Sequence, residues 1–252
     1  MIEIIVLSLI QGITEFLPIS SSSHLILVSE YLDLDNQNLS IDVSLHIGSF
    51  LAVIIYFYQD FINFFKNKFL FLKIIVSSIP VILVGFLLIK SGTIEKIRNL
   101  ELIAWTTLLF GLLLFVSDKF KVEKNINKNF TFKKAIFIGV LQILSLIPGV
   151  SRSGIAITAA RLLKFKRVDA AKISFLLSIP ILGAVSIFGI KNIVLSESYY
   201  FTELNIIAIV FSLVFSIITI KLFLKFILKF NLNIFVYYRV LLGLILIIIA
   251  YL

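Results

Sequence analysis

Polar side chains gather in the stretch QGITEFLPISSSSH, from Gln11 to His24, near the start of an otherwise apolar sequence. Gln11 and Glu15 are four residues apart and therefore share one face of a helix. A lone carboxylate in apolar surroundings is costly unless it is paired with an arginine, a metal ion or a proton. His24 follows Ser21 by three residues, so its imidazole can take a proton from a serine or a water, or donate one to a leaving group.

A second polar stretch, PGVSRSG (148–154), carries complementary chemistry. The guanidinium of Arg152 is a planar fork that suits phosphate oxygens, and Ser151 and Ser153 add hydrogen-bond donors. Each serine run can cap a helix, and a helix N-terminus with its free N–H groups favours an anion. The two stretches together predict a site for a phosphate or a carboxylate. Since Glu15 is acidic, a cation must mediate between it and such a ligand, either Arg152 or a divalent metal that prefers oxygen ligands, Mg²⁺ or Ca²⁺.

The elements that position these residues follow from hydropathy. A membrane-spanning helix needs about 20 mostly apolar residues. Six segments satisfy this: 41–58, 73–90, 101–117, 171–190, 204–224 and 234–252. The stretches 2–30 and 133–163 are apolar but interrupted by a proline and a serine-rich run. Irregular backbone inside a bilayer must be surrounded by protein or a watery cavity, so we predict that each of these two stretches is a re-entrant helical hairpin.

The two hairpins belong to an internal repeat. LSLIQGITEFLPISSSSHL (7–25) and IGVLQILSLIPGVSRSGI (138–155) share a glutamine, then a proline six or seven residues later, then the pattern P-x-x-S-x-S. Three spans follow each, so the repeats are inverted in the membrane, an arrangement that points to a site near the bilayer midplane. The predicted fold is an all-α polytopic membrane protein, a single membrane domain over 1–252. Six transmembrane helices and two re-entrant hairpins form its inverted-topology repeats, 1–130 and 131–252.

Charge predicts the orientation. Most of the 23 lysine and arginine residues lie in the loops of one face, near 59–73, 118–134, 164–172 and 221–233. The opposite face has few basic residues and carries the acidic Glu30, Asp33 and Asp35. Because positively charged loops stay on the cytoplasmic side, we expect the lysine-rich face to be cytoplasmic. Both termini and the opening of the site are then external.

Composition excludes several classes. With 60% hydrophobic residues and a mean hydropathy of +1.11, the chain has more apolar surface than a soluble core can bury, so it is an integral membrane protein. It has no cysteine and therefore no disulfide, thiolate metal site or thiol nucleophile. The net charge of +9 reports orientation, and we expect no nucleic-acid partner. No cleavable signal peptide is evident, so we expect the N-terminus to belong to the mature fold.

Several of these residues also fit a structural role. The serine run alone suits packing between helices, and Glu15 with Arg152 would fit a structural ion pair. His46 fits a hydrogen-bonded helix contact, Arg239 a snorkelling or structural charge, and Arg161 a position at the cytoplasmic interface. Lipid-facing or interfacial positions suit the aromatic residues, including Trp105, Tyr237 and Tyr238.

QGITEFLPISSSSH and PGVSRSG together resemble the signatures of the undecaprenyl-diphosphate phosphatase family, the bacitracin-resistance proteins of bacteria. Those signatures are a Glu or Gln four residues before a Glu, leading into P-x-S-S, and a PG-x-SRSG segment. SFLLSIP (174–180) and YYRV (237–240) also resemble family segments in their expected order. The two signatures are separated by about half the length of the chain, and the similarity extends over the whole chain.

The resemblance implies an enzyme that hydrolyses the terminal phosphate of undecaprenyl diphosphate to give undecaprenyl phosphate and inorganic phosphate. Such an enzyme acts at the outer face of the bacterial cytoplasmic (inner) membrane, recycles the lipid carrier for peptidoglycan synthesis and confers bacitracin resistance. The resemblance also implies a divalent cation such as Mg²⁺, a polyprenyl diphosphate lipid substrate and interdigitated inverted repeats. The oligomeric state stays open, a homodimer included.

Carried over residue by residue, the resemblance assigns the roles of the site. The catalytic residues are Glu15, Ser21, His24 and Arg152. The substrate phosphate-binding residues are Ser20, Gly149, Ser151, Arg152, Ser153, Gly154 and Arg239. The metal ligands are Glu15 and Gln11. Three positions depart from the family pattern: Gln11 stands where many members have Glu, Ser22-Ser23 replaces a common Thr-Gly, and Ala156 stands where many have Thr.

Two questions stay open at this point. The nucleophile is either Ser21, activated by His24, or a water. A transporter that moves a polyprenyl phosphate across the bilayer would use the same mid-membrane anion site, because inverted repeats with broken helices also suit alternating access. A purely structural scaffold leaves Glu15, His24 and Arg152 unexplained. Release of phosphate by the purified protein would separate the enzyme from the transporter.

Overall fold

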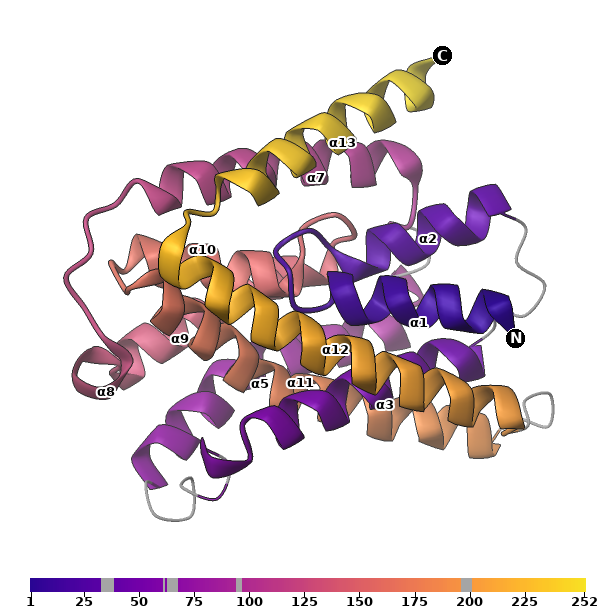
Figure 1. The fold of residues 1–252 in the computed structure, drawn as a ribbon, viewed down its shortest axis with the longest axis horizontal. Helices are drawn as coiled ribbons and strands as arrows, with labels where there is room; N and C mark the ends of the chain where they lie inside the picture. The colour runs from indigo at the N-terminus through magenta and orange to yellow at the C-terminus, as the bar shows by residue number, and fades with distance from the viewer. Residues whose placement is uncertain (33–38, 61, 63–67, 94–96, 196–200) are drawn as a thin grey trace.

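The computed structural model describes residues 1–32, 39–60, 62, 68–93, 97–195 and 201–252, and over them the chain is helical (Figure 1). Asp33 and Asp35, which the charge argument used, lie outside this part. The helices in chain order are α1 (Ile2–Thr14), α2 (Ser21–Leu32), α3 (Leu39–Tyr56), α5 (Lys68–Lys90), α7 (Leu100–Asp118), α8 (Ile126–Asn129), α9 (Phe132–Gln142), the 3₁₀ turn η1 (Ile143–Leu146), α10 (Arg152–Leu162), α11 (Arg167–Leu195), α12 (Glu203–Lys229) and α13 (Asn233–Tyr251).

Six helices among the described residues are long and apolar enough to cross a membrane: α3, α5, α7, α11, α12 and α13. Each contains most of one predicted span, so the prediction of an all-α polytopic membrane protein is confirmed. Each helix begins before its predicted span; α11, for example, begins at Arg167 rather than at residue 171. A helix does not need apolar residues in its last turns, because these can extend beyond the hydrocarbon layer.

The two interrupted stretches each form a pair of helices around a break. In the first, α1 and α2 flank the segment that contains Pro18, and in the second, α9 with η1 and α10 flank the segment that contains Pro148. Within each stretch the two helices contact each other. The segment between α1 and α2 is the first tip (15–20), and that between η1 and α10 is the second tip (147–151). That each pair re-enters the membrane face it came from stays a prediction.

The two broken stretches pack reciprocally on the long helices. The first lies along α12 through α1, and the second lies along α5 through α9 (Figure 1). Glycines allow both approaches: a Cβ on Gly12 would lie 2.9 Å from the backbone nitrogen of Ser216, and a Cβ on Gly139 would overlap the carbonyl of Ser77. Among the long helices, α3 packs against α11 and α12, α7 packs against α13, and α5 packs against α11. The division of the chain into repeats at residue 130 stays a prediction.

The lysine-rich segments meet at one end of the bundle. Asp118, at the end of α7, pairs with Arg167 at 2.8 Å and accepts a hydrogen bond from the backbone N–H of Leu232 at 3.3 Å. Lys172 pairs with Asp60 at 2.7 Å, which joins the start of α11 to the segment after α3. These contacts bring together parts of all four loops that the charge argument placed on one face.

Arg161 departs from its predicted position. The side chain was expected at the membrane interface, but it is 1% exposed and pairs with Asp118 at 3.1 Å. Its other nitrogens donate to the carbonyls of Phe165, Asp118 and Phe120 at 2.6–2.9 Å. A guanidinium can be buried when a carboxylate and carbonyls satisfy its donors, and the sequence spacing did not indicate that Asp118 would supply them.

Candidate active site

The two tips touch, and charge joins them. Arg152, the first residue of α10, places Nη2 2.7 Å from Oε1 of Glu15 in the first tip, and the same nitrogen donates to the Glu15 carbonyl at 3.3 Å. The hydroxyl of Ser153 donates to the carbonyl of Leu17 at 2.7 Å. Helices α2 and α10 both begin at this junction. The N-termini of two helices therefore lie at the same place as the predicted acid and its cation.

Each tip ends in a serine with left-handed backbone. Ser20 precedes α2 with φ of 80° and Ser151 precedes α10 with φ of 71°. For a residue other than glycine this conformation costs about 1–2 kcal/mol, so the surrounding contacts must hold it. The separation of Ser20 and Ser151 in the sequence is one residue larger than the separation of Pro18 and Pro148. The predicted repeat pattern, which matched Ser21 with Ser151, is therefore wrong by one residue.

Local hydrogen bonds stabilise the two turns differently. At the second tip, Ser151 caps α10 by accepting from the backbone N–H of Gly154 at 3.1 Å, and its hydroxyl lies 3.1 Å from that of Ser153. At the first tip, the Ser20 hydroxyl lies 3.3 Å from that of Ser22 and 3.0 Å from that of Ser23. The serine run thus fixes the start of α2 through contacts among its own hydroxyls.

Glu15 is the centre of the polar cluster. Only 6% of the residue is exposed. Its Oε1 is paired with Arg152, and its Oε2 accepts from the Ser21 hydroxyl at 2.6 Å and from Gln11 Nε2 at 3.1 Å. A buried carboxylate tolerates this position because charge and hydrogen bonds replace the water it lost. The structure brings together Gln11, Glu15, Ser21 and Arg152, as the sequence predicted.

The cluster continues away from the tips through Gln11. Nε2 of Gln11 lies 3.1 Å from Nδ1 of His46 and 3.5 Å from the hydroxyl of Ser49. Ser49 in turn lies within 3.2 Å of the hydroxyls of Ser212 and Ser216 on α12. His46 is thus confirmed as a hydrogen-bonded helix contact, and its partner is a residue of the site. No sequence pattern indicated this link, since His46 lies on a different helix, α3.

His24 does not lie on Ser21 as expected. Its Nδ1 is 2.6 Å from the carbonyl of Ser20, one helical turn earlier, and its Nε2 is 2.5 Å from the hydroxyl of Tyr238. The imidazole and the Tyr238 ring are stacked at 5.7 Å. Ser21 points instead to Glu15, although residues three positions apart lie on the same side of a helix. The sequence interpretation took Tyr238 as lipid-facing or interfacial and missed its contact with His24; its position next to Arg239 was the available signal.

Arg239 ties both tips to the long helices. The residue is fully buried, with 0% exposure. Its guanidinium donates to carbonyls of the two tips at 2.8–3.3 Å and of α7 at 3.2–3.5 Å: Pro18, Gly149, Val150, Thr106 and Thr107. These bonds fit the structural charge considered from composition. That Arg239 also binds phosphate stays a prediction.

Steric crowding explains why glycine stands at both glycine positions of the second signature, PGVSRSG. Gly149 has φ of 91°, and a Cβ there would overlap the Thr106 hydroxyl, which donates to the Pro148 carbonyl at 2.5 Å. A Cβ on Gly154 would lie 3.0 Å from Nη1 of Arg239. Both positions therefore allow close approach of other groups, and any phosphate contact by their backbone stays a prediction.

The donor set suits a divalent cation only in part. Over the described residues no group of three His, Cys, Asp or Glu side chains stands together to hold a metal ion. Glu15 offers a carboxylate, and Oε1 of Gln11 is buried with no hydrogen-bond partner in the part of the chain that the structure describes. Mg²⁺ is commonly held by one or two carboxylates together with substrate phosphates. The residues therefore fit a cation shared with a phosphate ligand rather than one held by protein alone.

Known proteins match this chain over nearly its whole length. The family described as bacitracin resistance protein BacA matches residues 4–245. An undecaprenyl-diphosphatase of Pelagibacter ubique is 47% identical over 251 residues, which are 99% of this chain and 98% of the relative. An undecaprenyl-diphosphatase of Roseobacter denitrificans is 37% identical and covers 99% of this chain and 98% of its own length. One from Alteromonas mediterranea is 47% identical over 72% of this chain and 73% of its own.

The two signatures and the polar cluster fall within the matched region, which runs through all six long helices. This agrees with the resemblance carried by QGITEFLPISSSSH and PGVSRSG. The chain belongs to the bacitracin resistance protein BacA family.

Proposed function

We propose that this membrane protein is a phosphatase that hydrolyses undecaprenyl diphosphate to undecaprenyl phosphate and inorganic phosphate. One observation carries the proposal: the Arg152 guanidinium and the Ser21 hydroxyl both contact the Glu15 carboxylate where the two broken stretches meet. A guanidinium can stabilise phosphate charge, and a carboxylate that accepts from a hydroxyl can take the proton of a nucleophile; both suit phosphoryl transfer. The names of the relatives give the substrate.

The work at the phosphoryl group is electrostatic. Phosphoryl transfer depends mainly on positioning and on stabilising charge that spreads over the equatorial oxygens. Arg152 supplies a fixed positive fork, and the N-termini of α2 and α10 add N–H groups at the same junction. In the structure, Glu15 holds the fork in place. When the diphosphate enters, its oxygens take over the donors of Arg152 that Glu15 now occupies.

Glu15 also receives the proton of the nucleophile. Its Oε2 accepts from the Ser21 hydroxyl at 2.6 Å, so the carboxylate lies within reach of a proton from Ser21 or from a water in its place. Attack on the terminal phosphorus breaks its bond to the bridging oxygen, and undecaprenyl phosphate leaves. If Ser21 attacks, water then hydrolyses the phosphoserine; if water attacks, phosphate is released directly.

His24 and Tyr238 act on the leaving group. Nε2 of His24 and the Tyr238 hydroxyl share a hydrogen bond at one side of the first tip, and the Ser20 carbonyl fixes the other ring nitrogen. The pair can hold a proton for the bridging oxygen as its bond to phosphorus breaks. This replaces the predicted activation of Ser21 by His24.

A divalent cation, Mg²⁺ in the first place, belongs to the proposal. Gln11 now faces Glu15 with Nε2; with its amide turned so that Oε1 faces the carboxylate, the two side chains would hold the cation together with the diphosphate oxygens. When bound, the cation neutralises phosphate charge. With Gln at position 11 the chain supplies one carboxylate where two are common in the family, so the phosphate oxygens carry more of the coordination.

The proposed location is a bacterial cytoplasmic membrane, with both termini and the opening of the site external. The supporting observation is that the lysine-rich segments gather at one end, where Asp118 and Lys172 make their ion pairs. Positively charged segments stay on the cytoplasmic side. Helix α10 leads from the second tip to Arg161, which pairs with Asp118 at the lysine-rich end, so its length of about 15 Å separates the tip from that end. The proposal places dephosphorylation of the lipid on the opposite face.

Phosphate release by purified protein tests the function. Undecaprenyl diphosphate in detergent with Mg²⁺ should yield one phosphate per lipid, and a chelator should stop the reaction. Glu15→Gln, His24→Ala and Arg152→Ala should each lose activity, whereas Lys164→Ala, which breaks an exposed ion pair with Glu123, should keep it. Single-turnover trapping of a phosphoserine would assign the nucleophile to Ser21. A protein that releases no phosphate but moves labelled lipid across vesicles would overturn the proposal in favour of a transporter.

A further inference from the structure

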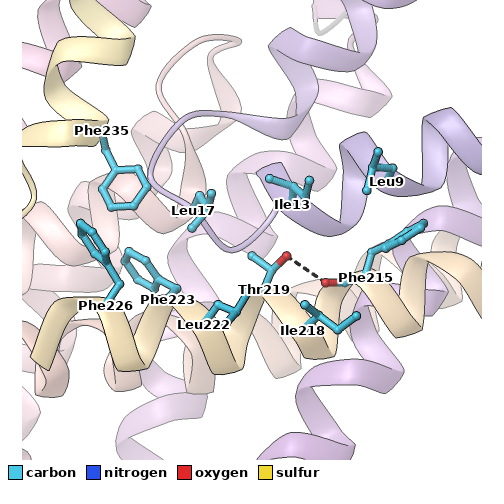
Figure 2. A pocket seen from close by; sticks show the side chains of 10 residues that line it. All are labelled: Leu9, Ile13, Leu17, Phe215, Ile218, Thr219, Leu222, Phe223, Phe226 and Phe235. Atoms are coloured by element: carbon cyan, nitrogen blue, oxygen red, sulfur yellow. Dashed lines mark hydrogen bonds between the residues drawn. The ribbon is translucent and has the colours of Figure 1, made fainter.

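An apolar groove runs along α12, and α1 and the first tip form its other side (Figure 2). Its volume is about 510 Å³, within the range of small-ligand sites. Leu9, Ile13 and Leu17 form one wall, and Ile218 and Leu222 of α12 line the other. The groove is lined by hydrocarbon side chains on both walls.

The groove offers a ligand no free polar group. Thr219 is the only polar residue among those that line it, and its hydroxyl donates to the Phe215 carbonyl at 2.8 Å (Figure 2). At one end, Phe235 packs against Phe223 and Phe226, with ring centroids 5.4 and 5.7 Å apart. A hydrocarbon chain with methyl branches would fill such a surface, whereas a polar ligand would lose its hydrogen bonds to water.

The groove adjoins the proposed active site at Leu17. This residue is two positions after Glu15, and its carbonyl accepts the Ser153 hydroxyl that joins the two tips. The groove follows α12 from Phe215 to Phe226, which at 1.5 Å per residue is about 16 Å. It therefore passes the junction of the tips and continues toward Lys229, the end of α12 on the lysine-rich side.

We propose that this groove binds the polyprenyl chain of the substrate next to its diphosphate. The inference rests on the proposed function, and it adds a binding site for the lipid tail. A diphosphate held at the tips leaves its first isoprene units beside Leu17, in the wall of the groove. The volume is too small for the whole C55 chain, so the rest of the chain lies among the membrane lipids. The groove then selects for a branched chain joined to a phosphate.

The absence of cysteine in this chain allows a direct test. Leu222→Cys places a single thiol in the groove, and Ile206→Cys places one on the same helix outside it; both native side chains are more than half exposed, so neither change disturbs packing. The measurement is the rate of labelling by a maleimide in detergent, with and without undecaprenyl phosphate. With the lipid at about ten times its Kd, labelling of L222C should slow about tenfold. Labelling of I206C should not change.

Two controls identify the occupant. Inorganic phosphate and phosphatidylglycerol should leave the labelling of L222C unchanged. Equal protection by phosphatidylglycerol would mean that ordinary lipid fills the groove, which would overturn the inference. The inference would also fail if undecaprenyl phosphate protected neither thiol, or if it protected both. Because labelling does not depend on turnover, it is read separately from the phosphatase assay. Phosphate release without protection refutes the groove alone, and protection without phosphate release refutes the proposed activity alone.

A kinetic variant makes a second test. Leu222→Trp fills the groove and should lower kcat/KM for undecaprenyl diphosphate about tenfold, through KM. Ile206→Trp is the matched control and should leave both constants unchanged. An unchanged kcat/KM in L222W, with the protein still monodisperse, would contradict binding in the groove.

Discussion

The first broken stretch, α1 to α2, and the second, α9 to α10, both end their tips in a serine with left-handed backbone, but they carry different side chains. When Ser20 is aligned with Ser151, the two tips match, because both serines have left-handed backbone immediately before a helix. Each stretch packs on a long helix of the other half of the chain. The similarity is therefore that each stretch places the N-terminus of a helix, α2 or α10, at the junction of the two tips.

The difference lies in charge. In the same alignment Glu15 corresponds to Leu146, and Ser21 corresponds to Arg152. The acid comes from one stretch and the cation from the other, and they meet at 2.7 Å. Two identical tips would place like charges together in a buried site, which is strongly unfavourable. A site with opposite charges therefore needs the two repeats to have diverged at these positions.

The two stretches also differ in the hydrogen bonds of a buried glutamine that both contain. Gln11 and Gln142 also correspond in this alignment, and both are fully buried. Gln11 donates to Glu15, whereas neither amide atom of Gln142 has a hydrogen-bond partner among the described residues. Leu146 stands where the acid would be. Gln142 keeps the residue type of the first stretch without the partner that satisfies it there.

The largest effect is expected from changing the cation at the junction, Arg152. Arg152→Lys keeps a positive charge but loses the planar fork, so kcat/KM for undecaprenyl diphosphate should fall at least 100-fold, on the order of a lost transition-state donor. The double variant Glu15→Arg with Arg152→Glu restores an ion pair and should stay inactive, because the cation then lies on the wrong tip. Phosphate release is the measurement, and size-exclusion chromatography checks the fold. Recovery of activity in the double variant would mean that the two tips are interchangeable.

The glutamine pair should give an effect of about tenfold. Gln11→Leu removes a hydrogen bond to the buried Glu15 carboxylate, and loss of about 1.4 kcal/mol corresponds to about tenfold in kcat/KM. Gln142→Leu should leave activity unchanged and raise the free energy of unfolding, since it removes a buried amide without partners. Assays of both variants, with thermal unfolding in detergent, check this. If Gln142→Leu lost as much activity as Gln11→Leu, the two stretches would share the chemistry.

A smaller, severalfold effect is expected at Tyr238. Tyr238→Phe keeps the stacked ring but removes the hydroxyl that contacts Nε2 of His24. In the alignment of the two stretches His24 corresponds to Ile155, so the second stretch has no imidazole at this position. The loss should appear in kcat rather than KM. The neighbouring Tyr237→Phe, at an exposed position, is the control and should have no effect. Because the two groups act as a unit, His24→Ala with Tyr238→Phe should be no worse than His24→Ala alone; additive losses would contradict the shared role.

Much of this comparison could be predicted from the sequence. Six apolar windows of about 20 residues predict six helices because a bilayer leaves few alternatives for the backbone. The cost of an unpaired charge among apolar residues predicted a cation next to Glu15, with Arg152 and a divalent metal as the two candidates. The repeat was visible in the shared glutamine and proline, and it placed the two charged stretches at equivalent points of the fold.

Contacts between distant helices could not be predicted in the same way. The tyrosine that holds His24, the histidine that contacts Gln11 and the acid that pairs with the buried Arg161 all lie on other helices, and such pairings depend on rotation and depth. The repeat register was wrong by one residue because prolines were aligned. Proline only breaks a helix, whereas the left-handed serine fixes where the next one begins.

The smallest expected effect, about 1 kcal/mol, distinguishes the two serines. Ser151→Ala removes the cap on Gly154 and keeps a side chain in left-handed backbone, so the free energy of unfolding should fall by about 1 kcal/mol. Ser151→Gly loses the same cap but relieves the backbone cost, so its stability should stay near that of the unaltered protein. At Ser20, whose hydroxyl contacts other serine hydroxyls, Ala should cost less and Gly should stabilise. Thermal unfolding of the four variants measures the order. If Ala and Gly were equivalent at both positions, the left-handed turn would not be the feature that the two tips share.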